Sequence, residues 1–98
     1  MTSSRVGVNV TVTLPTTLRA RVGQRTHFDV SGQTIRDVID SLDREFPGLR
    51  FNFCYETGEL RPFVNIFLDG VNVRYLSGLD TPVRDGAAIH ILPSVAGG

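Results

Sequence analysis

The C-terminal stretch Ala88-Ile89-His90-Ile91-Leu92-Pro93-Ser94-Val95-Ala96-Gly97-Gly98 constrains how the rest of the chain folds. Residues 88–92 alternate in a way that predicts a β-strand with Ile89 and Ile91 facing the core. Residues 93–98 are mostly small, and they reach about 20 Å when extended. Because glycine lacks a Cβ, the last two residues suit a channel too narrow for other side chains. We therefore expect 93–98 to form a flexible tail whose reacting group is the α-carboxylate of Gly98.

A C-terminal strand needs neighbours in a sheet, and the N-terminal third of the chain provides two. Apolar residues occupy every second position from Val6 to Leu14, which predicts a strand with one buried face, and Pro15 ends it. A second strand is predicted over residues 26–30, after a turn or short loop over residues 16–24. Adjacent strands with a short connection most simply form an antiparallel hairpin.

One amphipathic helix follows the hairpin. Thr34 is a good N-cap, and Asp37 at the third helical position suits the positive end of the helix dipole. Pro47-Gly48 marks the C-terminal end of the helix. Between these signals the apolar residues recur at spacings of three and four, at Ile35, Val38, Ile39, Leu42 and Phe46.

The second half of the chain contains shorter elements. Residues 49–62 are compatible with either a loop or an extra short strand, although Phe51, Phe53 and Tyr55 alternate. Residues 63–68 have the composition of a strand. The remaining signals are a tight turn at Asp69-Gly70, a continuation over Val71–Tyr75, apolar anchors at Leu79 and Val83, and a turn at Asp85-Gly86.

This order of elements predicts an α+β fold in which a mixed sheet packs on one main helix. The economical closure places the last strand beside the first in parallel, with residues 31–87 as the crossover. That arrangement is the β-grasp. We expect a disordered lead-in at residues 1–5, the β-grasp domain at 6–92 and the tail at 93–98.

Composition excludes several classes of function. Ten arginines balance ten acidic residues, so a nucleic-acid partner is not expected. No apolar stretch is long enough for a membrane span, and no signal peptide is visible, so we expect a cytoplasmic protein. Cys54 is the only cysteine and has no His or Lys nearby in sequence, which favours an incidental thiol in a reducing compartment. No Cys, His and Asp cluster has the spacing of a metal site, so no metal or bound cofactor is predicted.

The chain resembles a known family over nearly its whole length from Val6 on, most strongly in its C-terminal third. The run Thr81-Pro82-Val83-Arg84-Asp85-Gly86, followed by Ile89 to Gly98, is similar to the ending of the ubiquitin-like MoaD/ThiS sulfur carriers. Within that family, Arg61-Pro62-Phe63-Val64-Asn65-Ile66-Phe67 and Val95-Ala96-Gly97-Gly98 look most like actinobacterial carriers that feed sulfur to cysteine synthesis.

The resemblance implies a reaction cycle centred on Gly98, with Gly97 beside it. An E1-like activating enzyme of the MoeB/ThiF type would use Mg-ATP to adenylate the Gly98 carboxylate. A rhodanese-like domain or a cysteine desulfurase would then supply sulfur, giving a thiocarboxylate. A sulfur-accepting synthase, which in the cysteine pathway would hold pyridoxal phosphate, would consume it. ATP and pyridoxal phosphate belong to the partners, so this chain is expected to be a protein cosubstrate and not an enzyme.

A partner must also bind the folded body. The register that turns Val64, Ile66 and Leu68 inward turns Phe67 outward, and the same count places His90 and Leu92 outward on the last strand. We expect Phe67 and Leu92 to form an exposed apolar patch at the base of the tail, with His90 at its rim. Partner-binding residues are therefore predicted to be Phe67, His90, Leu92, Pro93, Val95 and Ala96.

Three other functions remain open from the sequence. The chain could be the small subunit of molybdopterin synthase, which would also carry a thiocarboxylate. It could be a ubiquitin-like modifier that joins Gly98 to lysines of other proteins. It could be a passive β-grasp interaction module, although a Gly-Gly at the C-terminus disfavours that reading. A monomer is expected for the free carrier.

Overall fold

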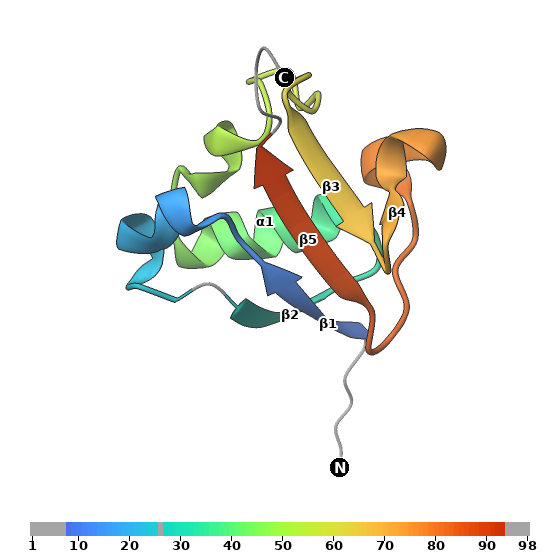
Figure 1. The fold of residues 1–98 in the computed structure, drawn as a ribbon, viewed down its shortest axis with the longest axis horizontal. Helices are drawn as coiled ribbons and strands as arrows, with labels where there is room; N and C mark the ends of the chain where they lie inside the picture. Colours follow the sequence, from blue (N-terminus) through green and yellow to red (C-terminus); the bar gives the residue numbers. More distant parts are fainter. Residues whose placement is uncertain (1–7, 26, 94–98) are drawn as a thin grey trace.

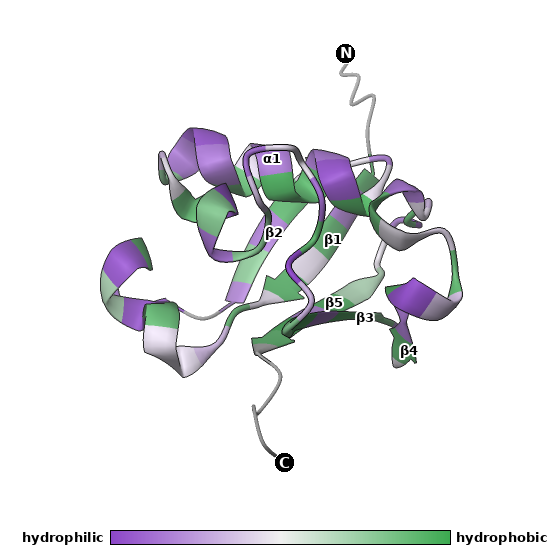
Figure 2. Ribbon diagram, turned by 90° about the horizontal axis from the view of Figure 1, so that it is seen from above, coloured by the Kyte–Doolittle hydropathy of each residue, from purple (hydrophilic) through white to green (hydrophobic). Residues whose placement is uncertain are grey.

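The computed structural model describes residues 8–25 and 27–93 as one sheet with α1 packed on one of its faces (Figures 1 and 2). The strand order is β2-β1-β5-β3-β4, so β5 is the central strand. The strands are β1 (Val8–Thr13), β2 (His27–Gly32), β3 (Val64–Leu68), β4 (Val71–Asn72) and β5 (Ala88–Pro93). The helices are α1 (Ile35–Glu45) and four 3-10 segments, η1 (Thr16–Val22), η2 (Leu49–Asn52), η3 (Val73–Tyr75) and η4 (Gly78–Asp80).

The pairing of the first and last strands confirms the predicted β-grasp closure. β1 and β2 form the antiparallel hairpin, in which Val10 lies opposite Val30. β1 also pairs with β5 in parallel, from Thr11 opposite Ala88 to Thr13 opposite His90. A parallel pair needs a long crossover connection. Here the connection from β1 to β5 contains α1 and all the other elements between these two strands. The lead-in expected at residues 1–5 lies outside the described residues.

The sheet has one buried face and one open face, as the period-two patterns predict. Ile89 and Ile91 of β5 are 0% and 1% exposed, and Ile66 of β3 is 0% exposed. These side chains meet the apolar stripe of α1, which consists of Ile35, Val38, Ile39 and Leu42. In the described part of the chain, no helix covers the other face of the sheet (Figure 2).

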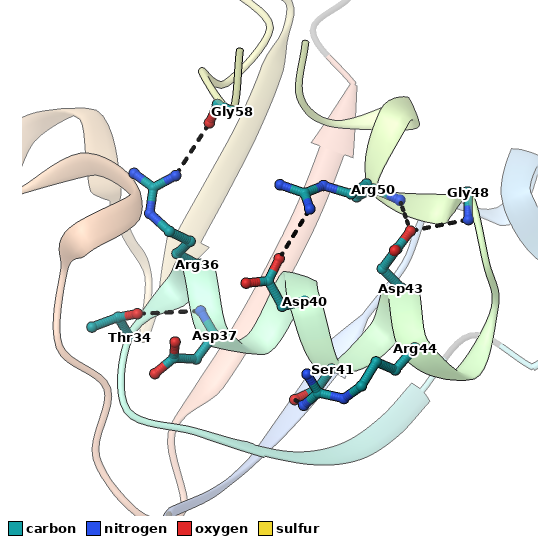
Figure 3. A network of polar contacts seen from close by, with 10 residues as sticks. All are labelled: Thr34, Arg36, Asp37, Asp40, Ser41, Asp43, Arg44, Gly48, Arg50 and Gly58. Carbon is teal, nitrogen blue, oxygen red and sulfur yellow. Dashed lines mark hydrogen bonds and ion pairs between the residues drawn. The ribbon is translucent and has the colours of Figure 1, made fainter. Parts of the chain in front are cut away.

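The start of α1 confirms the predicted cap. The Thr34 hydroxyl accepts a hydrogen bond from the Asp37 backbone N–H at 3.2 Å. The Asp37 carboxylate in turn accepts from the Gln33 backbone N–H at 3.1 Å. The bond from Asp37 to Thr34 satisfies one of the free N–H groups at the start of the helix (Figure 3), and the Asp37 carboxylate satisfies the N–H of the residue before the cap.

The predicted turn over residues 16–24 contains a helical segment, η1. Pro15 explains why β1 ends before it. The Thr11 N–H donates to the Ala87 carbonyl, and the same parallel pattern continued by four residues requires a donor from position 15. Proline has no N–H, so pairing stops after Thr13 and His90. β5 therefore extends beyond the end of β1.

Residues 49–62, for which two interpretations were open, form η2 and a turn closed by an isolated bridge between Cys54 and Leu60. One carboxylate oxygen of Asp43 accepts from the backbone N–H groups of Gly48 and Arg50, at 3.0 and 3.1 Å (Figure 3). The Arg36 guanidinium donates to the Gly58 carbonyl at 3.3 Å. The polar face of α1 thus holds this segment against the domain.

The two Asp-Gly turns form where they were predicted. Asp69 and Gly70 have φ values of 49° and 89°, the left-handed conformation required by the tight β3–β4 turn. Their turn is tied to the central strand, because the Asp69 carboxylate accepts from the Ala88 backbone N–H at 2.9 Å. The Asp85 carboxylate accepts from the Asn9 backbone N–H at 3.0 Å.

None of the helices within residues 8–25 and 27–93 combines the length and apolarity that a membrane crossing needs.

Candidate functional site

The site begins where β5 ends. Pro93 is the last residue of β5 and lies opposite Val64 of β3, so the strand ends one residue later than predicted. Proline is compatible with this position because β1 has already ended on that side of β5, so no N–H donor is needed there. Four predicted site residues, Val95, Ala96, Gly97 and Gly98, lie outside the described residues. The structure therefore defines the base from which they depart.

That base is the most constrained strand of the sheet. β5 pairs with β1 on one side and with β3 on the other, and its two isoleucines are buried in the core. A segment that continues from Pro93 is consequently anchored to the centre of the domain.

The open face next to this base carries the three predicted partner-binding side chains on the described strands. Phe67 lies directly opposite His90 on β5 and opposite Asn72 on β4. Leu92 lies opposite Asn65, two pairs further along β3 and therefore on the same face. Since directly opposed residues on adjacent strands share a face, the predicted register is confirmed.

The exposure of the predicted apolar patch differs from the expectation in one respect. Leu92 is 43% exposed, as expected for a contact residue. Phe67 is only half-buried, because the side chains of His90 and Asn72 flank it on both neighbouring strands. Phe63, just before β3, is 51% exposed and was not among the predicted site residues. The signal that could have found it is its place in the outward-facing series with Phe67.

His90 is exposed on the same row as Thr13 and Phe67, which is the predicted rim position. Within residues 8–25 and 27–93, His, Cys, Asp and Glu side chains form no group of three that could hold a metal ion.

Cys54 lies in the domain core, away from solvent. It is 2% exposed and belongs to the core cluster. Burial raises the pKa of its thiol, while the positive charges of Arg50 and Arg36 act in the opposite direction with smaller effect. A thiol that is buried and mostly protonated is a poor nucleophile. These properties fit the incidental role expected from the sequence.

Sequence reasoning missed a hollow at the end of β5. It has a volume of about 150 Å³, and Ile91 and Leu92 form one wall where β5 extends beyond β1. Pro15 and Leu18 at η1 and Phe53 after η2 contribute further apolar surface. The signal was present in Pro15, which ends the pairing of β1 with β5, but its consequence depends on where η1 then packs.

Comparison with known proteins was decisive for the family. The model of the ThiS family matches residues 12–98, which include β2, α1, the central strand β5 and the Gly-Gly end. The chain belongs to the ThiS family.

Relatives of this ThiS-family chain agree with that assignment. It is 40% identical to the sulfur carrier protein CysO of Mycobacterium tuberculosis over 93% of this chain and all of that protein. It is 39% identical to small archaeal modifier protein 3 of Haloferax volcanii over 84% of this chain and 90% of that protein. Among solved structures, the crystal structure of the Amycolatopsis orientalis BexX/CysO complex contains a chain that superposes with a TM-score of 0.84 at 35% identity, covering 91% of this chain and 99% of that chain.

Proposed function

We propose that this ThiS-family chain is a sulfur carrier whose terminal Gly98 is converted to a thiocarboxylate. The observation that carries the proposal is the relationship to the sulfur carrier CysO over that protein's full length, together with a family match that runs to Gly98. The fold supports it, because the segment that follows Pro93 starts from the central strand of the sheet.

The chemistry follows from the weakness of a carboxylate as an electrophile. A carboxylate oxygen of Gly98 attacks the α-phosphorus of ATP in the activating enzyme, and pyrophosphate leaves. The terminal sulfur of a persulfide then attacks the acyl carbon, and AMP leaves. A thiol cleaves the resulting sulfur–sulfur bond, which leaves the sulfur on Gly98 as a thiocarboxylate. The sulfur is then a nucleophile for an acceptor.

The partners supply the catalytic groups in this scheme. An E1-like enzyme of the MoeB/ThiF type would bind Mg-ATP, and a rhodanese-like domain or cysteine desulfurase would supply the persulfide. A synthase, which in cysteine synthesis would hold pyridoxal phosphate, would take the sulfur for cysteine or another sulfur metabolite. The chain itself acts as a cosubstrate that binds, positions and delivers. The complex of the related carrier with BexX supports the idea that a carrier of this kind docks on an enzyme.

The test is the intact mass of the protein after incubation with a MoeB-type activating enzyme, Mg-ATP and a persulfide donor. The expected result is a mass increase equal to the replacement of one oxygen by one sulfur. A variant lacking Gly98 should show no increase and should melt at the same temperature as the wild type. Absence of the increase with an enzyme that converts its own carrier would contradict the proposal.

A second candidate function is protein modification, which the relationship to a small archaeal modifier protein favours. It begins with the same adenylate but ends in an amide bond between Gly98 and a lysine of another protein. Covalent adducts of this chain on unrelated proteins, formed without a sulfur donor, would support it. This sequence contains no lysine, so chains of the protein on itself through lysine are excluded.

A further inference from the structure

The 3-10 segment η1, which contributes Thr17 and Leu18 to the hollow beside β5, carries two arginines without a hydrogen-bond or ion-pair partner among residues 8–25 and 27–93. Nine arginines are within residues 8–25 and 27–93. Seven of them make a hydrogen bond or ion pair: Arg25 to Glu45, Arg36 to Asp80, Arg44 to Ser41, Arg50 to Asp40, Arg61 to the Phe51 carbonyl, Arg74 to the Val64 carbonyl and Arg84 to Asp69. Arg19 and Arg21 make none within the described ranges, and both lie on η1.

The two arginines place positive charge on η1, the same segment that contributes Thr17 and Leu18 to the hollow. η1 contains no acidic residue, and both arginines are exposed. In a 3-10 helix, side chains three residues apart lie one above the other, so Arg21 is aligned with Leu18, which lines the hollow. The Arg21 guanidinium lies close to Gly48 in the loop after α1. A Cβ atom added to Gly48 would be 3.7 Å from Nη2 of Arg21. Even there it finds no hydrogen-bond acceptor within the described ranges.

The hollow itself suits one apolar side chain. Its apolar lining includes Pro15, Leu18, Phe53 and Leu92, and its volume is about 150 Å³. An apolar cavity of about this size in another protein accommodates a benzene molecule. A leucine, methionine or phenylalanine side chain is therefore of the right size.

The location at the end of β5 identifies which partner would fill the hollow. Residues 93–98 reach about 20 Å when extended. An enzyme that holds Gly98 in its active site must therefore bring its own surface close to Leu92, which is a wall of the hollow.

We propose that η1 and the adjacent hollow form a docking surface for an acidic segment of the activating enzyme. In this arrangement one large apolar side chain of the enzyme enters the hollow, and carboxylates beside it pair with Arg19 and Arg21. This surface adjoins the open face that carries Phe67 and His90, because Leu92 belongs to both, so the enzyme would contact two sides of the tail's base. The inference rests on the proposed function, because it presumes that an enzyme receives the tail.

The electrostatic part is tested with the activating enzyme and Mg-ATP, by measuring KM and kcat for conversion of the carrier at low and high salt. The variant Arg19→Glu/Arg21→Glu should raise KM about tenfold or more with kcat nearly unchanged, and the difference should shrink at high salt. Arg19→Lys/Arg21→Lys should keep most of the affinity. Arg84→Glu, before the other end of β5, is the control for a charge reversal away from the hollow and should behave like wild type.

The apolar part is tested by filling the hollow. Thr17 is exposed and lines it, whereas the exposed neighbour Thr16 does not. Thr17→Trp should raise KM about tenfold, and Thr16→Trp should leave it unchanged, with similar melting temperatures for both.

The outcomes separate the two proposals. A wild-type chain that is converted, with Arg19→Glu/Arg21→Glu no worse than Arg84→Glu, would overturn the docking surface and leave the carrier function standing. A KM increase that persists undiminished at high salt would contradict the acidic partner segment. A wild-type chain that the enzyme neither binds nor converts would overturn both proposals.

Discussion

Replacement of Phe67 by Asp tests whether the open face of the sheet binds the activating enzyme, without disturbing the core. Phe67 and Ile66 are neighbours on β3 but point to opposite faces, and Ile66 is 0% exposed whereas Phe67 is half-buried. The same substitution at the two positions should therefore have different consequences. Phe67→Asp should impair docking of the activating enzyme in a folded protein, and Ile66→Asp should unfold the domain.

The magnitudes follow from burial. Full burial of a phenylalanine side chain contributes about 1.5–3 kcal/mol, so the half-buried Phe67 contributes about 1 kcal/mol to the free energy of unfolding. For a domain of this size, about 1 kcal/mol corresponds to a decrease of about 4–8 °C in Tm. A carboxylate at the position of Ile66 would be buried without a partner, at a cost of several kcal/mol. That cost is comparable to the whole stability of a small domain, about 5–15 kcal/mol.

The assay combines thermal unfolding followed by circular dichroism with ATP–pyrophosphate exchange catalysed by the activating enzyme. Phe67→Asp should melt within about 10 °C of wild type and show a KM increased about tenfold, as expected for loss of an apolar contact at an interface. If Phe67→Asp unfolds while Ile66→Asp folds, the assigned register of β3 is wrong. If Phe67→Asp folds with an unchanged KM, this face does not bind the enzyme.

Three further predictions concern the helix cap, the thiol and the tail. Thr34→Ala removes the acceptor of the Asp37 N–H and should lower the free energy of unfolding, measured by urea titration, by about 1 kcal/mol. An unchanged urea midpoint would show that the cap does not contribute to stability. Because burial raises the pKa of Cys54 above 9.0, its contribution to stability is present below pH 9 and is lost as the pH rises further; Cys54→Ala should flatten the fall in Tm above that pH, and an identical fall in both proteins would refute the assignment. Gly97→Val adds a branched side chain next to the reacting carboxylate and should reduce kcat/KM for activation strongly with no change in Tm, so normal kinetics in this variant would argue against a narrow channel for the tail.

Local signals in the sequence were sufficient for the regular elements. The alternation in β1 and β5 reports which residues reach the core, since a strand with one buried face permits only one such pattern. Thr34 and Asp37 mark the start of α1 because the capping contacts join residues only three or four positions apart. The Asp69-Gly70 turn was predictable for the same reason, because the left-handed backbone conformation of a tight turn favours an Asp-Gly dipeptide.

Features that depend on tertiary contacts were not predictable in the same way. Phe51, Phe53 and Tyr55 alternate like a strand, but only Phe53 is buried. Asp43 of α1 accepts two backbone N–H groups from this segment and so supports η2 in place of a strand. The half-burial of Phe67 likewise depends on β4 and β5 lying on either side of β3. The hollow beside β5 depends on where η1 packs after Pro15, which no local pattern specifies.

The central claim is that sulfur is carried on Gly98, and the fragment masses of the C-terminal peptide test it most directly. The protein is incubated with the activating enzyme, Mg-ATP and a persulfide donor, then digested and analysed by tandem mass spectrometry. The account predicts that one oxygen is replaced by sulfur and that the change is confined to the fragment containing Gly98. Sulfur found instead as an added atom on Cys54, with an unmodified C-terminal peptide, would contradict it.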